Sequence, residues 1–133
     1  MIKNKNQALL RLSLPAHPLL EWMPSPCYNG LAMQEISALT LVLTDRCNFS
    51  CCYCPQLKGK DTLKINDILC FLDFLQPRLA KEVWLGFYGG EPLLAWPLIE
   101  ETVDHAKKNF KNTFLFTLTT NGSLLKKKHI LFF

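Results

Sequence analysis

Three cysteines lie close together after a hydrophobic segment. Cys47, Cys51 and Cys54 follow the apolar run 39–44, which predicts a buried β-strand. Thiolates bind zinc or an iron–sulfur cluster in preference to hard cations. A structural zinc site usually takes its ligands as two close pairs, and no second pair follows here. On a four-iron cluster, these thiolates would leave one iron without a protein ligand and therefore open for chemistry.

A zinc site is the alternative interpretation of the same thiols. Cys52, Cys27 or a histidine would then supply the missing ligand. The grouping of three thiols directly after a strand indicates reduced cysteines rather than a disulfide framework, and it predicts a cytoplasmic protein. Cys70 falls inside a predicted helix and is interpreted as a small buried side chain.

The sequence around these cysteines resembles the signature of the radical S-adenosylmethionine (radical SAM) superfamily. The matching residues are Thr44-Asp45-Arg46-Cys47-Asn48, Cys51 and Tyr53-Cys54. In that family the three cysteines hold a [4Fe–4S] cluster, and the amino and carboxylate groups of SAM chelate the open iron. One electron then cleaves SAM to a 5′-deoxyadenosyl radical. The resemblance implies that Cys47, Cys51 and Cys54 are the metal ligands and that Tyr53 contacts the adenine of SAM. The extra thiol of Cys52, and Pro55 where the family often has an aromatic residue, are departures from the pattern.

Two further motifs follow predicted strands in the order of this family. The sequence Gly89-Gly90-Glu91-Pro92 comes after the predicted strand 82–88 and resembles the GGE motif, whose backbone and acid bind the amino group of SAM. Glycine allows the backbone to approach a ligand closely. The sequence Thr120-Asn121-Gly122 follows the predicted strand 113–119 and resembles a motif of peptide-modifying radical SAM maturases. This resemblance implies that Asn121 lies near the SAM or substrate pocket, and a plain turn asparagine is the alternative.

Helices are expected between and after these strands. Apolar residues repeat along one face of 65–76 and of 97–109, and a third helix is expected to begin at Ser123. The order β-α-β-α-β-α predicts an α/β fold with a parallel sheet, both of whose faces are covered. The motifs then meet at the carboxyl ends of the strands. By resemblance, this is a partial radical-SAM-type (β/α) barrel with three βα units.

The chain is expected to divide at residue 38. Four prolines between Pro15 and Pro26 predict an irregular lead-in over 1–37, and 38–133 would be the N-terminal half of a radical SAM core domain. The family core has six βα units, so we expect a truncated chain that is too short for full enzyme activity alone. Among the described motifs, no residue is assigned a catalytic role of its own.

The expected function is that of a [4Fe–4S]- and SAM-dependent radical enzyme, or a fragment of one, that modifies a peptide or protein. The alternative is a non-catalytic remnant that binds an iron–sulfur cluster or zinc. The family implies a flavodoxin- or ferredoxin-like reductant as a partner. The formal charge of +4 is mild and no basic face rich in aromatic residues is evident, so nucleic acid is not an expected partner. No apolar run is long enough to span a bilayer.

Overall fold

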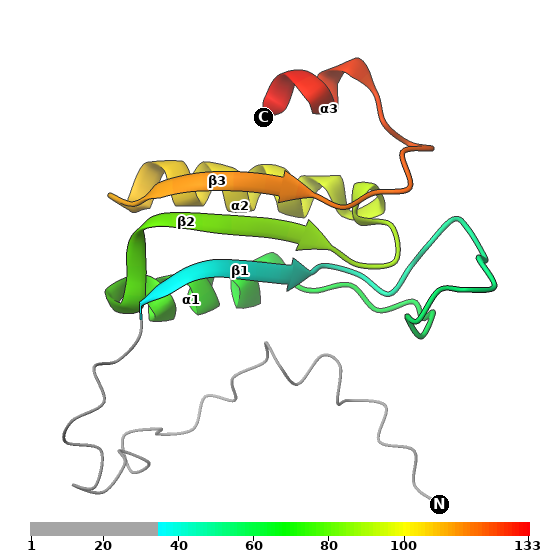
Figure 1. Ribbon diagram of the computed structural model, residues 1–133, viewed down its shortest axis with the longest axis horizontal. Coiled ribbons are helices and arrows are strands. Elements are labelled where there is room, and N and C mark those ends of the chain that lie inside the picture. Colours follow the sequence, from blue (N-terminus) through cyan, green and yellow to red (C-terminus); the bar gives the residue numbers. More distant parts are fainter. Residues whose placement is uncertain (1–34) are drawn as a thin grey trace, which may run out of the picture.

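The computed structural model describes residues 35–133, in which strands and helices alternate (Figure 1). The order is β1 (Ile36–Val42), α1 (Ile65–Leu75), β2 (Leu79–Tyr88), α2 (Trp96–Asn109), β3 (Thr113–Leu118) and α3 (Lys127–Phe132). Short 3-10 turns precede β2 and α2, at Gln76–Arg78 and Pro92–Ala95. The lead-in predicted for 1–37 lies almost wholly outside the described residues.

The three strands form one parallel sheet in the order β1-β2-β3. Leu41 pairs with Phe87 across the first two strands, and Leu85 pairs with Phe116 across the second two. A parallel neighbour needs a crossover connection, and α1 and α2 supply one each. The predicted α/β fold, a partial barrel of three βα units, is confirmed.

The hydrophobic core lies on one face of the sheet. Val83, Leu85 and Phe87 alternate along β2 and have no exposed surface. Both α1 and α2 lie behind the strands in Figure 1, and their buried side chains complete the core. The helix residues concerned are Ile68, Leu72, Leu75, Ile99 and Val103. Burying these side chains stabilises the sheet edge at which the three motifs meet.

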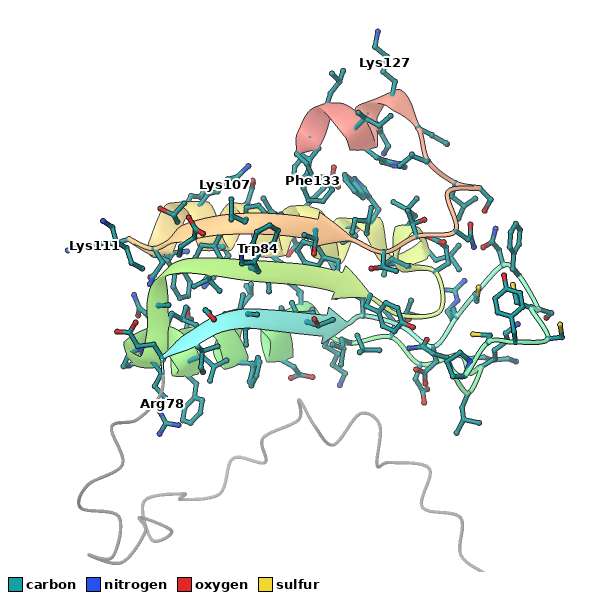
Figure 2. The ribbon with its side chains drawn as sticks, in the orientation of Figure 1. Arg78, Trp84, Lys107, Lys111, Lys127 and Phe133 are labelled. Atoms are coloured by element: carbon teal, nitrogen blue, oxygen red, sulfur yellow. The ribbon has the colours of Figure 1, made fainter. Side chains whose placement is uncertain are left out.

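The other face of the sheet is open within residues 35–133, which corrects the prediction that both faces are covered. Trp84 points to this face from β2 and is 51% exposed (Figure 2). Val42 on β1 is also exposed. The strand order does not reverse, so successive right-handed crossovers place α1 and α2 on the same side of the sheet.

Two other sequence predictions differ from the structure. Cys70 is exposed, because the buried face of α1 is formed by Ile68, Leu72 and Leu75. The third helix begins at Lys127 and not at Ser123. The hydroxyl and backbone N–H of Ser123 both donate to the side chain of Asn121, so Ser123 belongs to the preceding loop. In the part of the chain that the structure describes, no helix is long and apolar enough to cross a membrane.

Candidate functional site

The three sequence motifs meet at one edge of the sheet. The strands are parallel, so the loops after β1, β2 and β3 all leave from their carboxyl ends, which lie together in Figure 1. The loop after β1 carries the cysteines, the loop after β2 carries Gly89–Glu91, and the loop after β3 carries Asn121. Parallel α/β folds place their ligand sites at this edge.

The cysteine loop, residues 45–61, is closed at its base. The backbone N–H of Asp45 donates to the carbonyl of Asp61 at 2.9 Å, and that of Leu63 donates to the carbonyl of Leu43 at 2.8 Å. The buried hydroxyl of Thr44 lies 2.9 Å from the carbonyl oxygen of Asp61 and donates to it. These bonds fix where the loop leaves the sheet. Burial raises the pKa of Asp45 at this base, and the negative charge of Asp61 raises it further.

The cysteine side chains themselves are accessible and reduced. Cys47 and Cys51 are half-buried, Cys52 and Cys54 are exposed, and all four are free thiols. All four follow β1 within one loop. Within residues 35–133, no three side chains of the histidine, cysteine or acidic types form a metal-binding group. The structure therefore places the three predicted ligands on one loop but does not bring their sulfur atoms together.

Tyr53 is the most exposed aromatic residue of this loop. Its side chain is 83% accessible to solvent. A hydrogen bond to Cys51 raises the pKa of Tyr53, and the negative charge of the Cys51 and Cys54 thiolates adds to the effect. The ring is thus free to contact a ligand bound at the loop, as its predicted role requires.

Gly89 and Gly90 are packed against the start of the cysteine loop. The backbone N–H of Gly90 donates to the carbonyl of Thr44 at 2.8 Å, and that of Glu91 donates to the carbonyl of Arg46 at 2.8 Å. A Cβ on Gly89 would lie 2.6 Å from the Thr44 oxygen, and one on Gly90 would collide with the Arg46 oxygen. Gly89 also has a backbone φ of 150°, which residues other than glycine rarely adopt. Both glycines are therefore needed for the loops to meet.

The carboxylate of Glu91 is fully buried and accepts three hydrogen bonds. Oε1 accepts from the backbone N–H of Leu93 at 3.0 Å and from the hydroxyl of Thr120 at 2.7 Å. Oε2 accepts from the backbone N–H of Asn121 at 2.9 Å. The exposed fraction of Glu91 is 0%. Glu91 thus joins the loop after β2 to the loop after β3, in addition to the role toward SAM predicted for it.

Asn121 contacts the cysteine loop directly. Its Nδ2 donates to Oδ1 of Asn48 at 3.0 Å, and its Oδ1 accepts from the hydroxyl of Ser123 at 2.6 Å. Asn48 in turn donates to the Ser123 hydroxyl at 2.8 Å. The sequence analysis assigned no role to Asn48, Thr120 or Ser123. The available signal was their position, because Asn48 and Thr120 belong to the motifs and Ser123 directly follows one.

The comparison with known families agrees with this arrangement. The model of the radical SAM superfamily matches residues 41–133, which include all three motifs. The chain belongs to the radical SAM superfamily. Members of this superfamily use a [4Fe–4S] cluster and SAM.

Several curated proteins are similar to this chain. The radical SAM cyclopropyl synthase TigE of Paramaledivibacter caminithermalis is 29% identical over 113 residues, covering 71% of this chain and 24% of that protein. The GTP 3′,8-cyclase of Trichodesmium erythraeum is 38% identical over 103 residues, covering 71% of this chain and 30% of that protein. The GTP 3′,8-cyclase of Microcystis aeruginosa is 39% identical over 101 residues, covering 70% of this chain and 30% of that protein. The chain thus spans 24% to 30% of the length of these relatives.

The residues present fit the cluster that the family implies. Three free thiols with the predicted spacing lie on one loop, and soft thiolate ligands are those that iron–sulfur clusters take. The loop is fixed at its base, while Cys51 and Cys54 are joined within it by a single backbone hydrogen bond of 3.3 Å. The donor set and its loop therefore suit the cluster, and the closed base of the loop keeps the three thiols at the carboxyl edge of the sheet.

Proposed function

We propose that this chain forms the cluster-binding part of a radical SAM enzyme that modifies a peptide or protein. The single observation that carries the proposal is the meeting of three loops. The backbone N–H of Glu91 bonds to Arg46 of the cysteine loop, and its carboxylate bonds to Asn121 after β3. The three motifs of the superfamily therefore form one edge site.

The roles proposed for individual residues follow from their positions at this edge. Cys47, Cys51 and Cys54 would hold a [4Fe–4S] cluster. When bound, the cluster and SAM supply a one-electron cleavage that yields a 5′-deoxyadenosyl radical. The exposed ring of Tyr53 would pack against the adenine of SAM.

The loop after β2 would receive the methionine end of SAM. Backbone carbonyl groups of Gly89 and Gly90 are acceptors suited to an ammonium group, and Glu91 adds its negative charge. Asn121 keeps one N–H of its amide beyond the bond to Asn48, and this donor would face the SAM or substrate pocket.

The substrate is proposed from the motifs. Thr44–Asn48, the Gly89–Pro92 sequence and Thr120–Gly122 together resemble those of peptide- and sulfatase-maturing enzymes, which supports a peptide or protein substrate. A purine nucleotide is the second candidate, because GTP 3′,8-cyclases are 38% and 39% identical to this chain. The proposed setting is the cytoplasm, where thiols stay reduced, with a flavodoxin- or ferredoxin-like reductant.

Anaerobic reconstitution tests the metal part of the proposal. We expect roughly four irons and matching sulfide per chain, bound by three cysteines. Alanine at Cys47, Cys51 or Cys54 should abolish iron binding. Alanine at Cys52, in the same loop, or at the exposed Cys70 in α1 should leave it unchanged. Stoichiometric zinc without sulfide would instead support a non-catalytic zinc protein.

Incubation with SAM and dithionite tests the chemistry and the substrate class. We expect 5′-deoxyadenosine by liquid chromatography, and a greater yield with a peptide library than without it. Greater yield with GTP would favour the second candidate. If the electron paramagnetic resonance spectrum of the reconstituted cluster does not change when SAM is added, the proposed function is contradicted.

A further inference from the structure

Three polar side chains form a closed ring of hydrogen bonds between the cysteine loop and the loop after β3. Nδ2 of Asn48 donates to Oγ of Ser123 at 2.8 Å, and the Ser123 hydroxyl donates to Oδ1 of Asn121 at 2.6 Å. Nδ2 of Asn121 closes the ring by donating to Oδ1 of Asn48 at 3.0 Å. Each side chain donates once and accepts once within the ring. All three side chains lie at the surface.

The ring is attached to the buried sheet edge through Asn121. The backbone N–H of Asn121 donates to the carboxylate of Glu91, which is fully buried at the sheet edge. The backbone N–H of Ser123 also donates to Oδ1 of Asn121 at 2.9 Å, and this bond sets the turn. Asn121 and Ser123 therefore have fixed positions, and the third member, Asn48, is held by them.

Asn48 lies next to the first of the three proposed cluster ligands. On the N-terminal side of that ligand, the carbonyl of Arg46 accepts from the backbone N–H of Glu91 at 2.8 Å. On its C-terminal side, the backbone N–H of Phe49 donates to Sγ of Cys47 at 3.4 Å. The loop is exposed on both sides of Cys47, at Arg46 and Asn48. The ring thus adds a second connection, after Cys47, to the loop that follows β3, beside the Arg46–Glu91 bond before Cys47.

We propose that Asn48 is a positioning residue, which with Asn121 and Ser123 sets the place of the Cys47 thiolate relative to the loop Gly89–Glu91. This inference rests on the proposed function, because it concerns a cluster at Cys47 and SAM at the glycine loop. Loss of the ring leaves the Arg46–Glu91 bond before Cys47 in place but releases the segment after it, so that the first ligand can turn with respect to the SAM site.

Hydrogen–deuterium exchange on the cluster-free chain tests the ring itself. In Asn48→Ala and in Ser123→Ala, amides 47–54 should exchange roughly fivefold faster, as expected for loss of one net hydrogen bond. The double variant should exchange no faster than either single one, because the ring opens only once. Ser123→Thr keeps the hydroxyl and should restore slow exchange. Asn66→Ala, at an exposed asparagine in the first turn of α1, is the matched control.

The spectrum of the reconstituted cluster tests the positioning role. Asn48→Ala should retain the iron content of the unmodified chain but give a different electron paramagnetic resonance line shape when SAM is added. Asn66→Ala should give the original line shape. A purely structural role would lower the yield of folded protein without altering the spectrum of the folded fraction.

The two measurements separate the possible failures. Unchanged exchange in Asn48→Ala would show that the ring does not hold the loop. Faster exchange with an unchanged spectrum would overturn the positioning role. If the unmodified chain binds no iron, the proposed function fails, and with it the role at a cluster. The exchange data would then still decide whether the ring ties the loop to β3.

Discussion

The carboxylate of Glu91 accepts a hydrogen bond from the backbone N–H of Asn121 at 2.9 Å, although 29 residues separate them in the sequence. This bond joins the ends of β2 and β3 at the candidate site. Because Glu91 is fully buried, its carboxyl oxygens depend on hydrogen-bond donors, of which residues 35–133 provide three. The hydroxyl of Thr120 and the N–H of Leu93 are the other two.

Substitution Glu91→Gln is expected to destabilise the fold. In the unmodified protein, three donors form hydrogen bonds to the two carboxylate oxygens of Glu91. Glutamine replaces one of these oxygens with an NH₂ group, which is itself a donor. The free energy of unfolding should fall by about 1–3 kcal/mol, measured by urea denaturation. Glu101→Gln, on the exposed side of α2, is the control and should change little. Equal stability of the two variants would contradict the bridging role of Glu91.

Alanine at Gly90 should be far more harmful than alanine at Gly122. At Gly90 the new Cβ collides with the backbone oxygen of Arg46, which cannot move without separating the two loops. We expect a loss of about 1–3 kcal/mol in unfolding free energy and a reduced capacity to bind iron. At Gly122 no atom lies within 4 Å, and the cost is the positive φ of 77° alone.

The comparison of these two glycines is informative because both belong to the predicted motifs. Gly122→Ala should cost about 1 kcal/mol from backbone strain and should leave iron binding intact. Iron analysis after anaerobic reconstitution distinguishes the two variants. If both retain iron equally, close packing against Arg46 is not what the cysteine loop requires of Gly90.

The sequence predicted the arrangement of strands and motifs because both follow from local patterns. A continuous apolar run identified the first strand, and the turn motifs after 82–88 and 113–119 marked the ends of the other two and the sheet edge. Parallel strands then required the three loops to meet. This argument uses only the order of segments along the chain, which is why it succeeded.

The contacts within the site could not be predicted in the same way. The ring of Asn48, Asn121 and Ser123 joins side chains more than 70 residues apart, and spacing along a chain does not indicate which side chains meet across two loops. The prediction that Cys70 is buried was wrong for a different reason. Cys70 lies two positions after Ile68, about 200° around the helix, and therefore on the opposite face.

Tyr53→Ala should affect SAM binding without affecting the fold. The side chain is 83% exposed, so the unfolding free energy should change by less than about 0.5 kcal/mol. If the ring packs on adenine, binding of SAM to the reconstituted chain should weaken by about 0.5–1.5 kcal/mol, measured by anaerobic calorimetry. Tyr53→Phe keeps the ring and should bind normally. Leu57→Ala, 91% exposed in the same loop, is the control, and equal SAM affinity in all three variants would argue against the adenine contact.

The packing of α3 depends on a buried histidine. The ring centroid of His129 lies 4.3 Å from that of Trp96, and its Nδ1 accepts a hydrogen bond from the backbone N–H of Lys126 at 3.1 Å. Burial lowers the pKa of His129, the positive charges of Lys128 and Lys126 lower it further, and the negative charge of Glu100 acts in the opposite direction. The folded state therefore favours the neutral ring.

This shift predicts that α3 is lost in acid. Since the pKa of His129 is lower in the folded state than its ordinary value of 6.5, its contribution to stability is fully present above pH 6.5 and is lost as the pH falls through the folded pKa. Protonation also turns Nδ1 into a donor, which removes the bond from Lys126. The amide resonances of Lys127–Phe132 should lose their helical chemical shifts below pH 6.5 while those of the sheet persist. His129→Gln retains an acceptor and does not titrate, so its helix should persist to lower pH. A helix that melts at the same pH in both proteins would exclude His129 as the cause.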